Sequence, residues 1–170
     1  LGNSDANWYE KNTTAAEKPV REKAACELNK VVYGWHPYWV GSAYDNYDWN
    51  LLSHFSFFSY EVNAATGNAN STHGWSTSAA VDAALASGNT KVTLCVTLFS
   101  GHTTFFSSST SQQTLITNLI NLVQSKGAHG VNIDFEGIPS SQRTNFANFM
   151  VDLCDQMHTA IPGSEVSTVL

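Results

Sequence analysis

The sequence predicts an α/β fold in which parallel strands alternate with helices, the order that a (β/α)8 TIM barrel requires. Short β-branched or aromatic runs alternate along the chain with longer amphipathic segments. The run 129–137 is also preceded by a Leu-rich helical pattern and followed by a Phe-rich one, as expected for a strand that helices cover. A closed barrel needs roughly 250 residues. The 170 residues present therefore predict about its first half, strands 1–4 and the start of strand 5.

Charge divides the chain into two parts. Residues 1–30 hold five of the eight Lys and Arg residues and five acids, and we expect an N-terminal leader or linker there. Residues 31–170 hold three basic and nine acidic residues, which accounts for the net charge of −6. We expect this part to be the N-terminal half of a barrel, truncated at the C-terminus, because 165–170 resembles the middle of a strand. The acidic balance does not favour nucleic acid, and no apolar run of about 18 residues predicts a membrane span.

The first half of the chain predicts two strands. The first covers 31–35 and is followed by a loop over 36–39, because Pro fixes the backbone and removes a donor. The second lies near 51–61, with Tyr60 on the same side as His54, which we expect to be a hydrogen-bonded core histidine. A polar loop follows over 63–74, and 77–85 predicts a short Ala-rich helix.

The second half predicts two further strands and their helices. Residues 91–99 form an apolar strand buried on both faces, followed by a Ser- and Thr-rich loop over 100–111. Apolar residues at helical spacing over 115–123 predict a helix that stops at Gly127. After the strand in 129–137, another helix begins near Ser141 and ends at the Pro-Gly pair 162–163.

The strand in 129–137 has two different faces. Successive strand residues point to opposite sides, so Asn132, Asp134 and Glu136 share one face, opposite an apolar face. An ordinary half-exposed strand could present such a face to water. The flanking helices favour an interior position instead, where carboxylates cost several kcal/mol unless they are paired. The sequence therefore predicts a functional use for these polar groups.

The same run resembles the D-G-x-D-x-D-x-E signature of glycoside hydrolase family 18, the chitinase-like (β/α)8 barrels, in which it forms the fourth strand. Gly130, Asp134 and Glu136 match the signature. Asn132 replaces its second Asp, and His129 departs from its first. The letters G-V-N-I-D-F-E-G are similar to the branch of spore-cortex and peptidoglycan N-acetylglucosaminidases.

The resemblance implies a glycosidase that cleaves β-1,4-linked N-acetylglucosamine polysaccharide by a retaining, substrate-assisted mechanism. Glu136 would be the general acid and base, and Asp134 would orient the acetamide of the substrate. Asn132 could hold Asp134 by hydrogen bonding without adding a like charge. His129 has the wrong strand parity to join this row, and we expect it at a turn or strand start.

The resemblance also implies an aromatic sugar cleft. The loops after the carboxyl ends of parallel strands build the active site of a barrel. Trp35, Tyr38 and Trp39 follow the first strand, although core packing is an equal alternative for Trp35. Tyr60 belongs to a run, F-S-Y-E-V-N, that in relatives places an aromatic ring in the cleft.

Two other functions stay open at this point. A chitinase-like lectin has the same fold but has typically lost the acid, and the run Cys95-Val96-Thr97-Leu98 departs from the S-x-G-G of family members. A metal site could use Asp134 and Glu136, but no His or Cys spacing supports one. The resemblance implies no cofactor. It implies a secreted or cell-envelope protein, without a visible signal peptide.

Overall fold

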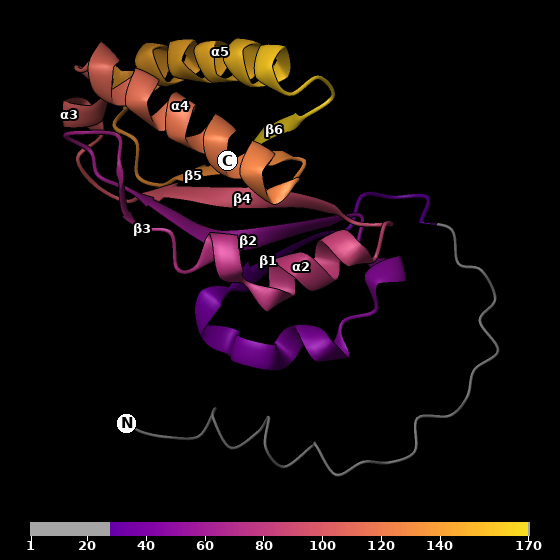
Figure 1. Cartoon of the computed structure of the whole chain (residues 1–170). Coiled ribbons are helices and arrows are strands. Elements are labelled where there is room, and N and C mark those ends of the chain that lie inside the picture. Colours follow the sequence, from indigo (N-terminus) through magenta and orange to yellow (C-terminus); the bar gives the residue numbers. More distant parts are fainter. Residues whose placement is uncertain (1–27, 170) are drawn as a thin grey trace, which may run out of the picture.

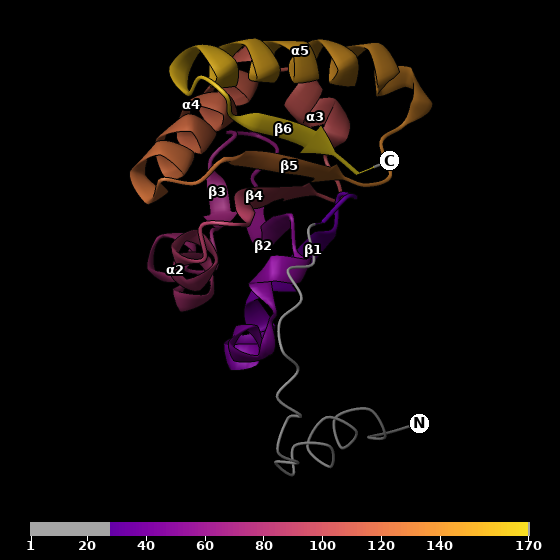
Figure 2. The ribbon, with the colours of Figure 1, turned by 90° about the vertical axis from the view of Figure 1, so that its right-hand side faces the viewer.

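The computed structural model describes residues 28–169, so the leader or linker predicted over 1–30 lies almost wholly outside the described residues. Five parallel strands form one sheet in the order β1-β2-β4-β5-β6. Figure 2 shows these strands following one another across the sheet as they do along the chain. The parallel α/β order is therefore confirmed. The strands are β1 Tyr33–Pro37, β2 His54–Val62, β4 Lys91–Leu98, β5 Gly130–Phe135 and β6 Glu165–Thr168.

Each longer helix packs against the strand that follows it. α2 contacts β4, α4 contacts β5 and α5 contacts β6, and α4 and α5 lie side by side (Figure 1). No helix within residues 28–169 has the length and hydrophobicity that a membrane span requires. The helices are α2 Ala79–Ala86, α3 His102–Phe106, α4 Ser109–Lys126 and α5 Arg143–Ala160, with 3-10 turns η1 Tyr38–Asn46, η2 Trp49–Leu51, η3 Trp75–Thr77 and η4 Ser140–Gln142.

The hydrophobic core lies between the helices and one face of the sheet. Val131, Ile133 and Phe135 of β5 belong to this core, and the ring of Phe135 stacks on Phe149 of α5 with centroids 5.9 Å apart. The alternation of a strand then leaves Asn132 and Asp134 for the opposite face, which we call the inner face. The predicted two-sidedness of this strand is therefore confirmed.

Three elements differ from the prediction. β1 continues through Pro37. A strand at the edge of a sheet tolerates Pro, because the backbone N–H groups on its outer side form no hydrogen bonds with another strand. A short strand β3, Ala69–Ser71, pairs antiparallel with β2 inside the predicted loop over 63–74. The predicted loop over 100–111 contains α3, because Phe105 and Phe106 are buried against Phe149.

A polar cluster occupies the inner face at the amino ends of the strands. His54 Nε2 lies 2.7 Å from Glu165 Oε2, and its Nδ1 lies 2.9 Å from Ser53 Oγ. Glu165 also accepts a hydrogen bond from Lys91. Burial raises the pKa of Glu165, but the hydrogen bonds from Lys91 and His54 outweigh it and hold the pKa below its usual value. His54 is therefore hydrogen-bonded, as predicted, at the end of the sheet opposite the polar residues of β5.

Gly130 lies where two backbones approach closely. A Cβ at this position would stand 1.9 Å from the carbonyl oxygen of Glu165, on the neighbouring strand β6. Real atoms cannot approach so closely, so β5 and β6 could not keep their present spacing with any other residue at this position.

We expect Gly130→Ala to lower the free energy of unfolding by about 3 kcal/mol, the upper range for overpacking a well-packed site. Gly127→Ala is the matched control: Gly127 has φ +68, but nothing lies within 4 Å of its Cβ position, so only about 1 kcal/mol should be lost. Urea unfolding of the two variants measures the difference. Equal losses would show that the close approach to Glu165 does not exist.

Candidate active site

The carboxyl end of β5 carries the polar row that the sequence predicts. Asn132 and Asp134 are buried on the inner face, with exposed fractions of 3% and 7%. Glu136 is the residue directly after the strand and is exposed. Its backbone N–H donates to the carbonyl oxygen of Leu98 at 3.2 Å, which ties it to the end of β4. One carboxyl group is thus buried, and the other stands at the rim.

Asn132 does not form the predicted hydrogen bond with Asp134. Its Oδ1 accepts from Trp35 Nε1 at 3.0 Å, and its Nδ2 donates to Ser167 Oγ at 3.0 Å. These two bonds run to β1 and β6, so the side chain joins three strands of the sheet. Asn132 therefore orients the indole of Trp35.

Asp134 has an altered acidity. Burial raises its pKa above the ordinary value for Asp, and the nearby carboxylate of Glu136 raises it further. The same surroundings act on Cys95 of β4: burial, and then Asp134, raise the pKa of its thiol, which stays protonated at neutral pH. A buried carboxyl group and an exposed one, two residues apart and close enough for one charge to affect the other, can divide the roles of charge stabiliser and proton donor.

His129 contributes no charge to this site. It lies just before β5, as predicted, and its Nδ1 accepts a hydrogen bond from the backbone N–H of Val92 at 3.0 Å. Burial lowers its pKa, and Lys91 lowers it further. Because Nδ1 accepts a hydrogen bond, it carries no proton, and the imidazole of His129 is neutral.

The predicted aromatic residues Trp35, Tyr38 and Trp39 are accessible. Their exposed fractions are 46%, 43% and 62%. The rings of Tyr38 and Trp39 meet edge to face with centroids 4.8 Å apart, and Trp39 in turn contacts Phe58 edge to face. Large exposed rings near the carboxyl ends of β1 and β2 are available for stacking with a ligand.

The prediction for Tyr60 is wrong. Its side chain is 1% exposed, and its hydroxyl donates to the carbonyl oxygen of Gly67 and accepts from Asn118 of α4. The cause is an irregularity in β2: Phe58 is opposite Cys95, but Tyr60 is opposite Val96, so Ser59 is an extra residue. One extra residue exchanges the two faces of a strand. Tyr60 therefore enters the core.

The same irregularity brings Glu61 to the inner face, where strict alternation along β2 does not predict it. The register places Glu61, Thr97 and Asp134 in one row across β2, β4 and β5. Two strand spacings separate Glu61 from Asp134, about 10 Å. No local signal in the sequence marks the irregularity at Ser59, so alternation alone could not have found Glu61.

Two hollows lie at the carboxyl ends of the strands, and one of them includes Glu61 and Thr97 of this row. One of about 400 Å³ lies at the ends of β2 and β4 and includes Glu61, Asn63, Thr97 and Phe99. The other, of about 560 Å³, lies after β5 and includes Glu136 and Arg143. Together with the exposed aromatic rings, they give the carboxyl ends of the strands both polar and apolar surfaces.

Comparisons with known proteins identify the fold. No protein-family model and no curated protein matches the sequence. Among solved structures, a chitinase from Bacteroides thetaiotaomicron superposes with a TM-score of 0.66 at 19% identity, over 83% of this chain and 46% of that one. A GH18 chitinase from Cycas revoluta, solved with (GlcNAc)4, gives 0.66 at 15% identity, over 81% and 45%. The spore cortex-lytic enzyme SleL from Bacillus cereus gives 0.61 at 21%, over 70% and 28%.

The chain has the fold of a family 18 chitinase barrel. It spans less than half the length of each of these proteins. The predicted half-barrel is thereby confirmed, and its fourth parallel strand, β5, is the one that carries Asp134 and is directly followed by Glu136.

At the end of β4 this family 18 fold has the run Cys95-Val96-Thr97-Leu98 in place of the S-x-G-G of family members. Cys95 and Thr97 are opposite Asn132 and Asp134 in the register and belong to the inner face, whereas Val96 and Leu98 belong to the core. The two inner residues are neutral and of moderate size. They leave the hollow beside Thr97 open.

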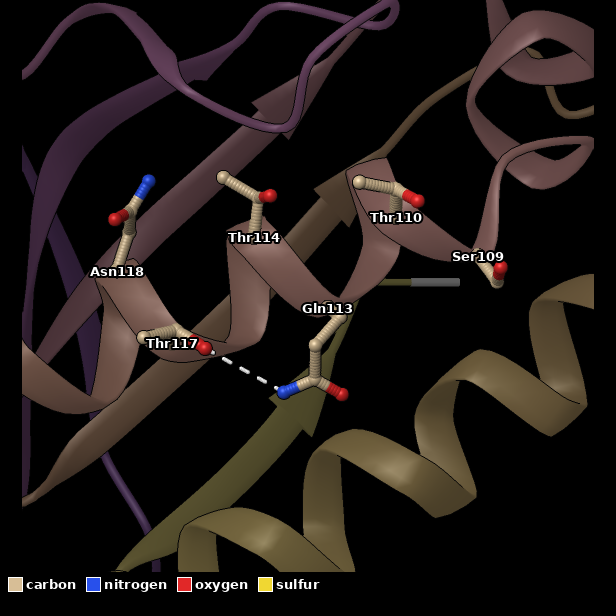
Figure 3. A pocket seen from close by; sticks show the side chains of 6 residues that line it. All are labelled: Ser109, Thr110, Gln113, Thr114, Thr117 and Asn118. Atoms are coloured by element: carbon tan, nitrogen blue, oxygen red, sulfur yellow. Dashed lines mark hydrogen bonds between the residues drawn. The ribbon is translucent and has the colours of Figure 1, made fainter.

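A further hollow lies away from the inner face, on the outside of α4. Figure 3 shows that all its lining side chains come from this one helix. They are Ser109, Thr110, Gln113, Thr114, Thr117 and Asn118. Hydroxyl and amide groups supply neither an acid nor a base near neutral pH, so this surface is no candidate for catalysis. Within residues 28–169, no three His, Cys, Asp or Glu side chains are grouped to hold a metal ion.

Proposed function

We propose that this protein is a glycoside hydrolase of family 18 that cleaves β-1,4-linked N-acetylglucosamine polysaccharide, either chitin or the glycan of peptidoglycan. The observation that supports it is the pairing of buried Asp134 with exposed Glu136 at the carboxyl end of β5. Proteins with this fold include chitinases and a spore cortex-lytic enzyme. Active sites of such barrels lie at the carboxyl ends of the strands.

Glu136 is the general acid and base in this proposal. It stands at the rim, where it can protonate the leaving oxygen and then activate a water molecule. Most retaining glycosidases use a second carboxylate on the opposite side of the sugar as nucleophile. Asp134 lies only two residues before Glu136, near the end of β5, so it cannot easily reach that side.

The nucleophile is then the acetamide oxygen of the substrate itself, as in the substrate-assisted enzymes of this family. Attack on the anomeric carbon forms a bond from that oxygen and breaks the glycosidic bond, whose oxygen takes the proton of Glu136. Asp134 orients the acetamide N–H and stabilises the positive charge that develops on the ring. Asn132 orients Trp35, and Trp35, Tyr38 and Trp39 supply apolar surfaces for sugar rings.

A chitinase-like lectin is the second candidate. The observation that favours it is the altered end of β4, where Cys95 and Thr97 stand beside the polar row. A lectin of this fold would bind N-acetylglucosamine oligomers without cleaving them. For either function, a polymer located outside the cytoplasm requires a secreted or cell-envelope protein, and we propose that location.

The test incubates the full-length protein with N-acetylglucosamine oligomers and with purified peptidoglycan. We expect cleavage of at least one of them, with the new reducing end first appearing in the same anomeric form as the bond that was cut, as NMR can follow. Inversion of that form would exclude the substrate-assisted mechanism. Binding without cleavage would establish the lectin, and neither binding nor cleavage would exclude both functions.

A further inference from the structure

The hollow of about 560 Å³ after β5 combines a carboxyl group, a guanidinium group and apolar walls. Glu136, the candidate general acid, lies directly after β5, and Arg143 is the first residue of α5. The apolar walls are Phe135, Ile138, Pro139, Phe146 and Val169. The hollow can therefore contact a ligand through charge, hydrogen bonds and apolar surface.

The charge of Arg143 is not used by the fold. The described part of the chain holds four Lys and Arg residues against nine Asp and Glu residues. Lys91 pairs with Glu165 and Lys126 with Asp82, whereas no ion pair in this described part includes Arg143, which is exposed. A guanidinium group keeps its charge at every pH that a protein meets. A permanent cation without a protein partner thus stands in the same hollow as the candidate general acid.

The position of the hollow relates it to the sugar that leaves. A general acid must contact the glycosidic oxygen, which joins the two sugars on either side of the cleaved bond. In the proposed mechanism Asp134, buried on the inner face, orients the acetamide of the first sugar. The lining of the hollow includes Glu136 and the segment that leads to α5, but not Asp134. The hollow is therefore placed to receive the second sugar, which is the leaving group.

Chitin and peptidoglycan differ in charge at this second sugar. Every sugar of chitin is neutral N-acetylglucosamine. In the glycan of peptidoglycan every second sugar carries a lactyl group, which either ends in a carboxylate or continues into a short peptide that carries carboxylates. A guanidinium group binds a carboxylate through two parallel hydrogen bonds, and the methyl group of the lactyl substituent can pack on an apolar wall. The hollow offers both kinds of contact.

We propose that Arg143 binds a carboxylate attached to the leaving sugar, and that the substrate is therefore the glycan of peptidoglycan rather than chitin. This assignment rests on the proposed function and selects between its two substrates. Arg143 is a specificity-determining residue in this proposal, because it contacts a substituent of the leaving sugar and not the reacting atoms.

The test gives the full-length protein two forms of one peptide-free tetrasaccharide of peptidoglycan. In the acid form the lactyl groups end in carboxylates, and in the amide form they are converted to neutral carboxamides of nearly the same shape. We expect kcat/KM of wild type to be about tenfold higher for the acid form, the scale of one charge-assisted contact at an exposed site. In Arg143→Gln this ratio should fall to about one. Lys30→Gln is the matched control, because it removes an exposed cation before β1, at the opposite end of the sheet, and should keep the wild-type ratio.

Two further measurements separate carboxylate binding from a general structural effect. Arg143→Lys keeps the charge but loses the paired hydrogen bonds, so its ratio should lie between those of wild type and Arg143→Gln. Because Arg143 is exposed, the wild-type ratio should also shrink as the salt concentration rises from about 50 mM to about 1 M. A purely structural role would lower kcat/KM for both forms equally and would leave the ratio unchanged by salt.

Glycan that keeps its peptides identifies the source of the carboxylate. A loss in Arg143→Gln with the peptide-free acid form assigns the lactyl carboxylate. A loss that appears only with the peptide-bearing glycan assigns a carboxylate of the peptide. Both results support the contact between Arg143 and the leaving sugar's substituent.

The failure of this inference is distinguishable from the failure of the proposed function. If wild type cleaves N-acetylglucosamine oligomers or either glycan, and Arg143→Gln lowers no activity toward a carboxylate-bearing substrate more than toward a neutral one, the role of Arg143 is overturned and the proposed function stands. A wild-type protein that cleaves none of these substrates would overturn the proposed function, and this inference with it.

Discussion

Replacement of Glu136 by Gln is expected to lower the turnover of N-acetylglucosamine oligomers by at least roughly 100-fold, the usual effect of losing a general acid. The amide of Gln has the shape and the hydrogen-bonding capacity of the carboxyl group but no proton to transfer. Glu136 is exposed and stands after the end of β5, so the substitution should leave the fold and oligomer binding largely intact. Measured kcat and Kd for the two proteins give the result.

Asp155→Asn provides the matched carboxyl-to-amide control, because Asp155 is exposed on α5. It should retain wild-type turnover. Unchanged hydrolysis in Glu136→Gln would remove Glu136 from the mechanism. If wild type already shows no hydrolysis while binding the oligomers, the lectin is the correct function.

The alternation of residues in β5 was sufficient to predict the candidate catalytic row. Val131, Ile133 and Phe135 are apolar without exception, so only one register could bury them against α4 and α5. That register necessarily turns Asp134 toward the inner face. A strand with such unequal faces is predictable from sequence because one residue of slip would exchange a buried apolar face for a polar one.

Alternation did not predict which face of the sheet the residues at the end of β2 occupy. Its residues are polar and aromatic on both sides, so hydrophobicity does not define its register. The extra residue at Ser59 moves Tyr60 into the core and Glu61 into the row with Asp134. The hydrogen bonds of Asn132 were unpredictable for a related reason, since they join β5 to Trp35 on β1 and Ser167 on β6. Contacts between distant parts of the chain are set by how the sheet curves, which a local pattern does not encode.

Replacement of Asp134 by Asn should also lower kcat by roughly 100-fold, the cost of removing one group that stabilises charge in the transition state. The loss should be confined to substrates that carry an N-acetyl group, since only these use their own acetamide as nucleophile. A thiazoline mimic of the cyclised intermediate should inhibit wild type and bind more weakly to Asp134→Asn. Failure of the thiazoline to inhibit wild type would contradict the substrate-assisted mechanism.

The raised pKa of Asp134 also predicts how kcat depends on pH and how Asp134→Asn changes stability. Because burial and Glu136 raise this pKa, the carboxyl group gains a proton at a higher pH than an ordinary Asp, and wild-type kcat should begin to fall there as the pH decreases. A raised pKa in the folded state also means that the ionised form costs stability above that pKa. Asp134→Asn should therefore be at least as stable as wild type at neutral pH, and its small residual kcat should lack this fall. A lower melting temperature in Asp134→Asn would show that Asp134 stabilises the fold rather than the reacting sugar.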